Sequence, residues 1–120
     1  MSRANWLAVL ISLVGIWAAW MVGKYVFEEI PHIEDEMAYV WQAKVIASGH
    51  LTLPEPENAG SFLVPFVVDY NGQRFGKYPL GWPVVLAVGI FLGARFLVNP
   101  LLAGLGVWLT YRLGERIFGA

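Results

Sequence analysis

Apolar residues are concentrated in long uncharged runs at the two ends of the chain, on either side of a more polar middle. The first run, Trp6 to Gly23, contains no charged residue. As a helix rising about 1.5 Å per residue it would cover about 27 Å, close to the ~30 Å hydrocarbon core of a bilayer. We therefore predict a membrane span at about 6–23. A cleaved signal peptide is the alternative, but the run exceeds a usual signal core and no Ala-x-Ala site precedes Lys24.

The C-terminal part of the chain is apolar again. Leu80 to Gly93 and Leu101 to Tyr111 are uncharged, and Arg95 lies between them. One continuous helix of about 40 residues would measure about 60 Å, twice the thickness of the bilayer core. We therefore predict two further spans, at about 79–96 and 99–118, joined by a tight turn.

The three predicted spans define an all-α integral membrane protein whose residues 1–120 form one membrane region. Arg3 at a cytoplasmic N-terminal end would place the loop at about 24–78 outside, because basic residues favour the cytoplasmic side. With three spans, however, Arg112 and Arg116 would also lie outside, contrary to that rule. A bacterial-type plasma membrane is the expected location.

The polar middle begins with a helical pattern from about Ile33 to Ser48. Three acids occupy its first turn, where the helix dipole stabilises negative charge, and Gly49 is a typical stop signal. The segment is too short and too polar to span, so we expect a helix lying on the membrane surface or packed against other spans. Its apolar residues recur every three or four positions and are Ile33, Met37, Val40, Trp41, Val45 and Ile46.

A β-hairpin is predicted later in the same loop. Phe62 to Tyr70 and Gln73 to Tyr78 are rich in β-prone residues and flank Asn71-Gly72. An Asn-Gly pair between such runs is the strongest short hairpin signal. We expect the hairpin to return the chain to the membrane.

Composition supports a membrane protein and excludes several other classes. Hydrophobic residues make up 58% and charged residues 14% of the chain, against roughly 45–50% and 25% in typical globular proteins. The net charge of −1, without a basic cluster, argues against a nucleic-acid partner. There is no cysteine and no metal-ligand spacing, so we expect no metal site and no cofactor.

The candidate chemistry lies in the acids of the first helical turn and in two later basic residues. Glu34, Asp35 and Glu36 are, in isolation, typical of a solvated helix start, and Lys77 is typical of an interfacial anchor. Both clusters, however, lie in the loop between predicted spans. There a carboxylate such as Asp35 would act as a base toward a nucleophile, while Arg74 and Lys77 would hold an anionic lipid phosphate.

Three motifs in this order resemble a known family. They are Asp35-Glu36-x-x-Tyr39, Gln42-Ala43-Lys44-x-x-x-x-Gly49 and Gly76-Lys77-Tyr78-Pro79-Leu80-Gly81-Trp82-Pro83. Together with the flanking spans, over residues 6–118, they resemble the N-terminal part of the C-type integral-membrane glycosyltransferases. The most similar members are the protein O-mannosyltransferases and the lipid A aminoarabinose transferases.

The resemblance implies transfer of a sugar from a polyprenyl-phosphate donor, at the outer or lumenal membrane face, to a protein, lipid or glycan acceptor. It implies that Asp35 is the catalytic base and that Lys77 contacts the donor phosphate. Glu36, Arg74 and Tyr78 are the further substrate-binding candidates. Tyr78 stands where the family has the first proline of a Lys-Pro-Pro-Leu motif.

Family members have many more spans than three, so the resemblance implies that this chain is an N-terminal fragment of such an enzyme. The alternative is a small non-catalytic membrane subunit or scaffold with a partner-binding external loop. A transporter or channel is disfavoured, because the uncharged runs carry no ionisable residue within the membrane.

Overall fold

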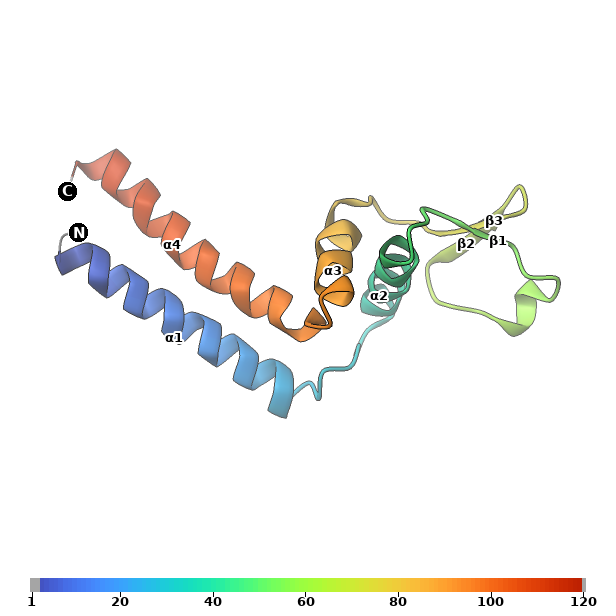
Figure 1. The fold of residues 1–120 in the computed structure, drawn as a ribbon, viewed down its shortest axis with the longest axis horizontal. Coiled ribbons are helices and arrows are strands. Elements are labelled where there is room, and N and C mark those ends of the chain that lie inside the picture. Colours follow the sequence, from blue (N-terminus) through green and yellow to red (C-terminus); the bar gives the residue numbers. More distant parts are fainter. Residues whose placement is uncertain (1–2, 120) are drawn as a thin grey trace. The chain divides into compact units, whose positions relative to one another are not determined.

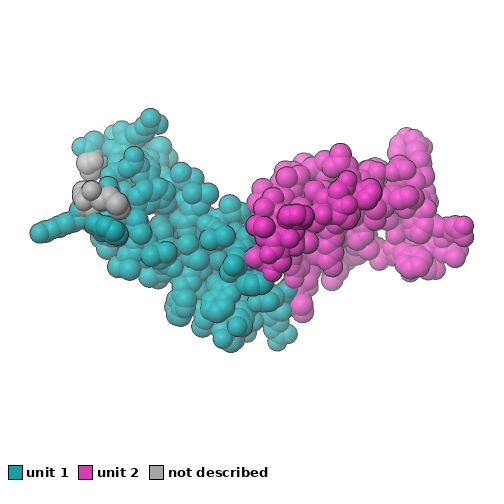
Figure 2. Space-filling view, in the orientation of Figure 1, with its two compact units in different colours: residues 1–29, 96–120 teal, residues 30–95 magenta. Residues whose placement is uncertain are grey.

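The computed structural model describes residues 3–119 of the chain. The predicted region 1–120 therefore includes three residues, 1, 2 and 120, that lie outside the described ones. The chain divides into two compact units (Figure 2). Unit 1 contains Met1–Glu29 and Phe96–Ala120, and unit 2 is Ile30–Arg95. The described residues are mostly helical, with one small sheet, so helix predominates as expected but the fold is not all-α.

Unit 1 is an antiparallel pair of long helices, α1 (Arg3–Tyr25) and α4 (Val98–Phe118), which lie side by side in Figure 1. A single 3₁₀ turn, η2 (Arg95–Leu97), leads into α4. Near the start of α1 and the end of α4, the Tyr111 hydroxyl donates a hydrogen bond of 2.5 Å to Asn5 Oδ1. The pair therefore brings the start of α1 next to the end of α4.

A glycine allows the two helices to approach closely. A Cβ at Gly104 would overlap the side chain of Ile16 and would lie 3.1 Å from the backbone oxygen of Ser12. Glycine at a helix contact lets two backbones come together, which increases van der Waals packing. Gly106, two residues further along α4, has open space around the position of a Cβ. The close approach is therefore specific to Gly104.

The remaining surface of α1 and α4 is apolar and uncovered. Both helices are long and apolar enough to cross a bilayer, and only 11% of the apolar window of each is buried inside the protein. Trp17 in α1, for example, is 59% exposed, and Leu109 in α4 is 56% exposed. This exposure differs from that of the core helix of a soluble protein, which is mostly buried.

The predicted span at 79–96 is replaced by a shorter helix, so two helices rather than three are long enough to cross a bilayer. Helix α3 (Gly81–Phe91) has 11 residues and measures about 16 Å, against the ~30 Å of a bilayer core. The apolar run is interrupted because Gly93, with φ 68°, adopts the left-handed conformation that ends helices.

Unit 2 is built on the packing of α2 (Glu34–Ala47) against α3, which are adjacent in Figure 1. The predicted helix at 33–48 is thus confirmed, although its buried face differs from the predicted stripe. Ile33 and Met37 of that stripe are exposed. Ala38 and Ala43 are buried in addition to Val45 of the predicted stripe, and their small side chains let the two short helices approach closely. The buried apolar side chains are Ala38, Ala43 and Val45 of α2 and Leu86 and Ala87 of α3.

The predicted hairpin is present. Strands β2 (Val67–Tyr70) and β3 (Gln73–Gly76) are antiparallel, and both residues of the Asn71-Gly72 turn have positive φ, 51° and 73°, as a type I′ turn requires. A short strand that was not predicted, β1 (Leu53–Pro54), pairs with the other edge of β3 and gives the order β1-β3-β2. The loop from β1 to β2 contains a 3₁₀ turn, η1 (Ala59–Ser61).

Gly104→Ala should separate α1 from α4, because the added methyl group meets Ile16 and the backbone of α1. We expect a destabilisation of about 1–3 kcal/mol, typical of overpacking. Gly106→Ala is the matched control and should be neutral or stabilising by up to about 1 kcal/mol, since alanine favours helix and open space surrounds the site. Thermal unfolding in detergent micelles measures both variants. Equal stability of the two variants would contradict the close contact.

Candidate functional site

One face of α2 carries three polar side chains of the candidate site. Asp35, Tyr39 and Gln42 are four and seven residues apart, a spacing that places them in line along about two turns of a helix. Asp35 and Tyr39 are half-buried, whereas Gln42 is buried. The polar face therefore runs from a partly accessible carboxylate to an enclosed amide.

The amide of Gln42 fixes β3 against α2. Its Oε1 accepts a hydrogen bond of 2.6 Å from the backbone N–H of Gly76, and its Nε2 donates one of 2.8 Å to the backbone oxygen of Leu51. Gln42 is only 1% exposed, so these bonds satisfy an amide that has no access to water. A Cβ at Gly76 would lie 3.2 Å from Gln42 Oε1, which explains why glycine occupies this position.

Two residues beyond Gly76, Tyr78 reaches the candidate base. Its hydroxyl donates a hydrogen bond of 2.5 Å to Asp35 Oδ1, across 43 residues of sequence. The Tyr78 ring lies between two others, with ring centroids 4.9 Å from Tyr39 and 5.7 Å from Phe66. Such tilted and edge-on arrangements are favourable for aromatic pairs. The ring contacts therefore hold the hydroxyl in place beside the carboxylate.

The hydrogen bond to Asp35, together with partial burial and the negative charge of that carboxylate, raises the pKa of Tyr78 to about 12. The phenol therefore stays protonated at physiological pH and donates to Asp35 throughout that range. Within residues 3–119, Asp35 Oδ2 accepts no side-chain or backbone hydrogen bond. One carboxylate oxygen is thus held by Tyr78, and the other is available to a substrate hydroxyl.

Lys77 presents its ammonium group next to the same aromatic rings. The Nζ atom lies 3.7 Å from the centroid of the Phe66 ring and 5.1 Å from that of Tyr78. The side chain is exposed, and no carboxylate of the described chain forms an ion pair with it. An exposed cation–π contact contributes about 0.5–1 kcal/mol and does not neutralise the charge of the ammonium. Lys77 is therefore suited to bind an anion.

Phe66 adopts an unusual backbone conformation to provide this platform. Its φ of 58° is left-handed, which costs a residue with a side chain roughly 1–2 kcal/mol. Its backbone oxygen accepts a hydrogen bond of 3.0 Å from the N–H of Lys77, which extends the β2–β3 pairing by one step. The strained residue therefore sets the position of both the platform and the lysine.

Glu36 takes part in starting α2. Its Oε2 accepts a hydrogen bond of 2.7 Å from the backbone N–H of His32, just before the helix begins. A glutamate in the first turn that reaches back to a preceding N–H stabilises a helix start, and its charge suits the helix dipole. The structure thus gives Glu36 a helix-capping contact, and its predicted substrate-binding role remains a prediction.

Arg74 is bonded within the loop rather than to the candidate base. It is 7% exposed, and its Nε and Nη2 donate to the two carboxylate oxygens of Asp69 at 2.6 and 2.7 Å. Nη1 donates to the backbone oxygen of Phe62 at 2.9 Å, and Nη2 lies 3.4 Å from that of Ala59. This fork-to-fork pairing organises the loop before β2. The structure thus gives Arg74 contacts within the loop, and its predicted substrate-binding role remains a prediction.

The structure thus brings together three of the predicted site residues, Asp35, Lys77 and Tyr78. It adds Phe66 and Tyr39, which were not predicted as site residues. The position of Tyr39, four residues after Asp35, is a signal that it shares a helix face with the acid. For Phe66 the sequence offers no comparable signal, because its position depends on a left-handed backbone in an irregular loop.

No group of three His, Cys, Asp or Glu side chains suited to hold a metal ion occurs among residues 3–119. Comparison with protein-family models, curated proteins and solved structures finds no match for this chain. The functional assignment therefore depends on the geometry of the site and on the order of its motifs.

The Asp69–Arg74 pair should make the loop before β2 sensitive to acid. The hydrogen bonds from Arg74 lower the pKa of Asp69 below its ordinary value of 3.8. A lowered folded-state pKa contributes stability that is present above pH 3.8 and is lost as the pH falls through the folded-state value. The Arg74 Nε–H resonance, followed by NMR in micelles, should stay sharp at neutral pH and broaden under strong acid.

Asp69→Asn should broaden the same resonance at all pH values and remove its pH dependence. Glu55→Gln is the control, because Glu55 contributes only a weak charge interaction to Arg74. If the Arg74 Nε–H resonance shows the same pH dependence in Asp69→Asn as in the native chain, the pairing is contradicted.

Proposed function

We propose that this chain is the membrane-embedded N-terminal part of a glycosyltransferase that uses a polyprenyl-phosphate-linked sugar donor. The observation that supports the proposal best is that Tyr78 contacts both candidate groups: its hydroxyl donates to the half-buried Asp35 carboxylate, and its ring centroid lies 5.1 Å from the Lys77 ammonium, which has no ion-pair partner in the described chain. A base and a phosphate-binding ammonium are the two groups that this transfer needs. Unit 2, which carries both groups, lies in sequence between two helices that are long and apolar enough to cross a bilayer.

The exposed surfaces of α1 and α4 support a membrane location. Their apolar side chains are almost entirely uncovered within the protein. Water-exposed apolar surface on this scale is rare in soluble monomers. The contact of α1 with α4 through Gly104 and Tyr111 supports a retained span rather than a cleaved signal peptide, because α1 then has a structural partner in the mature chain.

The distribution of arginines supports one orientation. Because α1 and α4 are antiparallel, Arg3 at the start of α1 and Arg112 and Arg116 near the end of α4 belong to the same end of unit 1. Only Lys24 and Arg95 flank the other end. By the positive-inside rule the arginine-rich end is cytoplasmic. With two spans instead of three, Arg3, Arg112 and Arg116 all obey the rule, and residues 26–94 lie outside.

The proposed reaction is a single displacement at the anomeric carbon of the donor sugar. The acceptor hydroxyl gives its proton to Asp35, its oxygen forms the bond to the anomeric carbon, and the bond from that carbon to the lipid phosphate oxygen breaks. The phosphate leaves with the bonding electron pair, and Lys77 stabilises its charge. Tyr78 holds Asp35 through Oδ1, and Oδ2 is left to accept the proton. Backside displacement inverts the configuration of the sugar.

Asp35→Asn should abolish transfer, because an amide cannot accept the proton. Loss of a general base costs typically about 10²–10⁴-fold in rate. The measurement is release of labelled sugar from polyprenyl-phosphate hexose or aminoarabinose donors in membranes that contain the protein. Glu34→Gln, a neighbouring acid of the same helical turn, is the matched control and should retain transfer. Full transfer by Asp35→Asn would favour the alternative of a non-catalytic membrane subunit.

The orientation is tested with single cysteines in a chain that has none of its own. A cysteine placed at Asn58, in the loop before η1, should react with a membrane-impermeant maleimide added from outside to intact cells. A cysteine placed at Gly119, at the end of α4, should react only after the membrane is opened. The reverse pattern would overturn both the orientation and an outward-facing site.

A further inference from the structure

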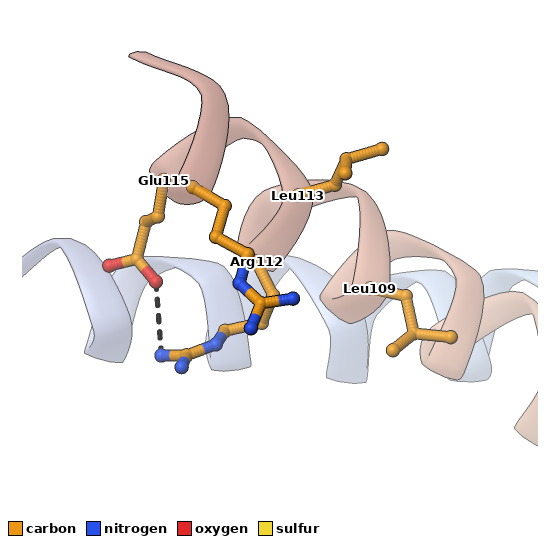
Figure 3. A pocket seen from close by; sticks show the side chains of 5 residues that line it. Leu109, Arg112, Leu113 and Glu115 are labelled. Carbon is orange, nitrogen blue, oxygen red and sulfur yellow. Dashed lines mark ion pairs between the residues drawn. The ribbon is translucent and has the colours of Figure 1, made fainter. Parts of the chain in front are cut away.

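The last turns of α4 form a surface hollow that combines apolar and charged walls. It is lined by Leu109, Arg112, Leu113, Glu115 and Arg116, and four of these side chains are labelled in Figure 3. Leu109 and Leu113 are one helical turn apart, as are Arg112 and Arg116. A row of leucines therefore lies beside a row of arginines on the surface of the same helix.

The charges of this hollow do not balance. Glu115 Oε2 pairs with Arg112 at 3.0 Å (Figure 3), and Glu115 Oε1 lies 2.6 Å from the Tyr111 hydroxyl, whose single proton it shares with Asn5 Oδ1. Both oxygens of the only acid in the hollow are thus engaged. Among the described residues Arg116 forms no ion pair. One guanidinium group with its planar set of donors, a geometry that matches phosphate oxygens, therefore remains available.

We propose that this hollow binds an anionic phospholipid. Arg116 donates to the headgroup phosphate, Arg112 supports it electrostatically, and Leu109 and Leu113 contact the first part of an acyl chain. The proposal rests on the membrane location proposed above, which puts the C-terminal end of α4 at the cytoplasmic leaflet. That leaflet carries most of the anionic lipids.

The pairing of leucines with arginines favours a lipid over a soluble phosphate. Exposed apolar side chains adjacent to a cation contribute nothing to the binding of a small hydrated anion, whereas they match a molecule with a phosphate at one end and hydrocarbon at the other. Leu109 and Leu113 are 56% and 58% exposed, so their surface is available to an acyl chain.

The test measures lipid selectivity of the full chain reconstituted in phosphatidylcholine vesicles. Electron spin resonance compares the immobilised fractions of spin-labelled phosphatidylglycerol and phosphatidylcholine. The native chain should prefer phosphatidylglycerol, and Arg116→Gln should reduce the preference about fivefold, the usual effect of one cation at a membrane surface. Arg112→Gln should reduce it less, since Arg112 is already paired with Glu115. Glu115→Gln should increase the preference, because it removes the competing carboxylate.

Lys24→Gln, at the opposite end of unit 1, is the matched control and should keep the preference of the native chain. Equal affinity of the native chain for both lipids, or an equal loss in Lys24→Gln and Arg116→Gln, would overturn the lipid site. Displacement of phosphatidylglycerol by millimolar inorganic phosphate would also overturn it, because it would identify a soluble anion as the ligand.

Alkaline carbonate extraction separates failure of this inference from failure of the membrane assignment. Retention of the native chain and all variants in the membrane pellet, with a selectivity that follows the arginines, supports the lipid site. Retention without selectivity overturns the lipid site alone. Release of the native chain into the supernatant overturns the membrane location and the lipid site together.

Discussion

The side-chain amide of Gln42 couples the one helix that carries the candidate base to the one strand that leads to the candidate phosphate-binding lysine. It is bonded on both sides, to Gly76 and to Leu51, and it is shielded from water. A buried amide that lost one partner would cost about 1–3 kcal/mol. The register of β3 against α2 therefore depends on this residue. Because Lys77 and Tyr78 directly follow Gly76, their approach to Asp35 depends on it as well.

Two supports act on the hairpin from different sides. Gln42 fixes its end against α2, while Arg74 ties the adjoining loop to β2 through Asp69 and two backbone oxygens. Gln42 and Arg74 both use most of their hydrogen-bonding groups inside the protein. Asp35 and Lys77, in contrast, keep groups that the described chain does not satisfy. The polar residues of unit 2 thus separate into those that build the site and those that are available to a ligand.

The elements of the fold could be predicted where local sequence determines them. The uncharged apolar runs predicted α1 and α4, and the Asn71-Gly72 pair predicted the hairpin. The cluster of acids in the first helical turn predicted the start of α2. The predicted third span corresponds to a helix of only 11 residues, because a run of apolar residues does not show that a glycine such as Gly93 will end the helix. Within the candidate site, the contact of Tyr78 with both Asp35 and Lys77 involves three residues that the motifs singled out, and their roles remain predictions. The pairing of Arg74 with Asp69 was not predicted, because the closeness of Arg74 and Lys77 in sequence does not show that alternate strand residues point to opposite sides.

The short length of α3 has a consequence for the whole proposed arrangement. A third crossing would have put the last turns of α4 on the same side as Asp35, with two arginines outside. In the proposed two-span arrangement the 11-residue α3 does not cross, so the chain between α1 and α4, with the eight acids between residues 26 and 94, would belong to one side. Under the same proposal the cytoplasmic end keeps the arginines Arg3, Arg112 and Arg116. The two-span proposal therefore assigns the proposed transfer reaction and the proposed lipid-binding surface to opposite sides of the membrane.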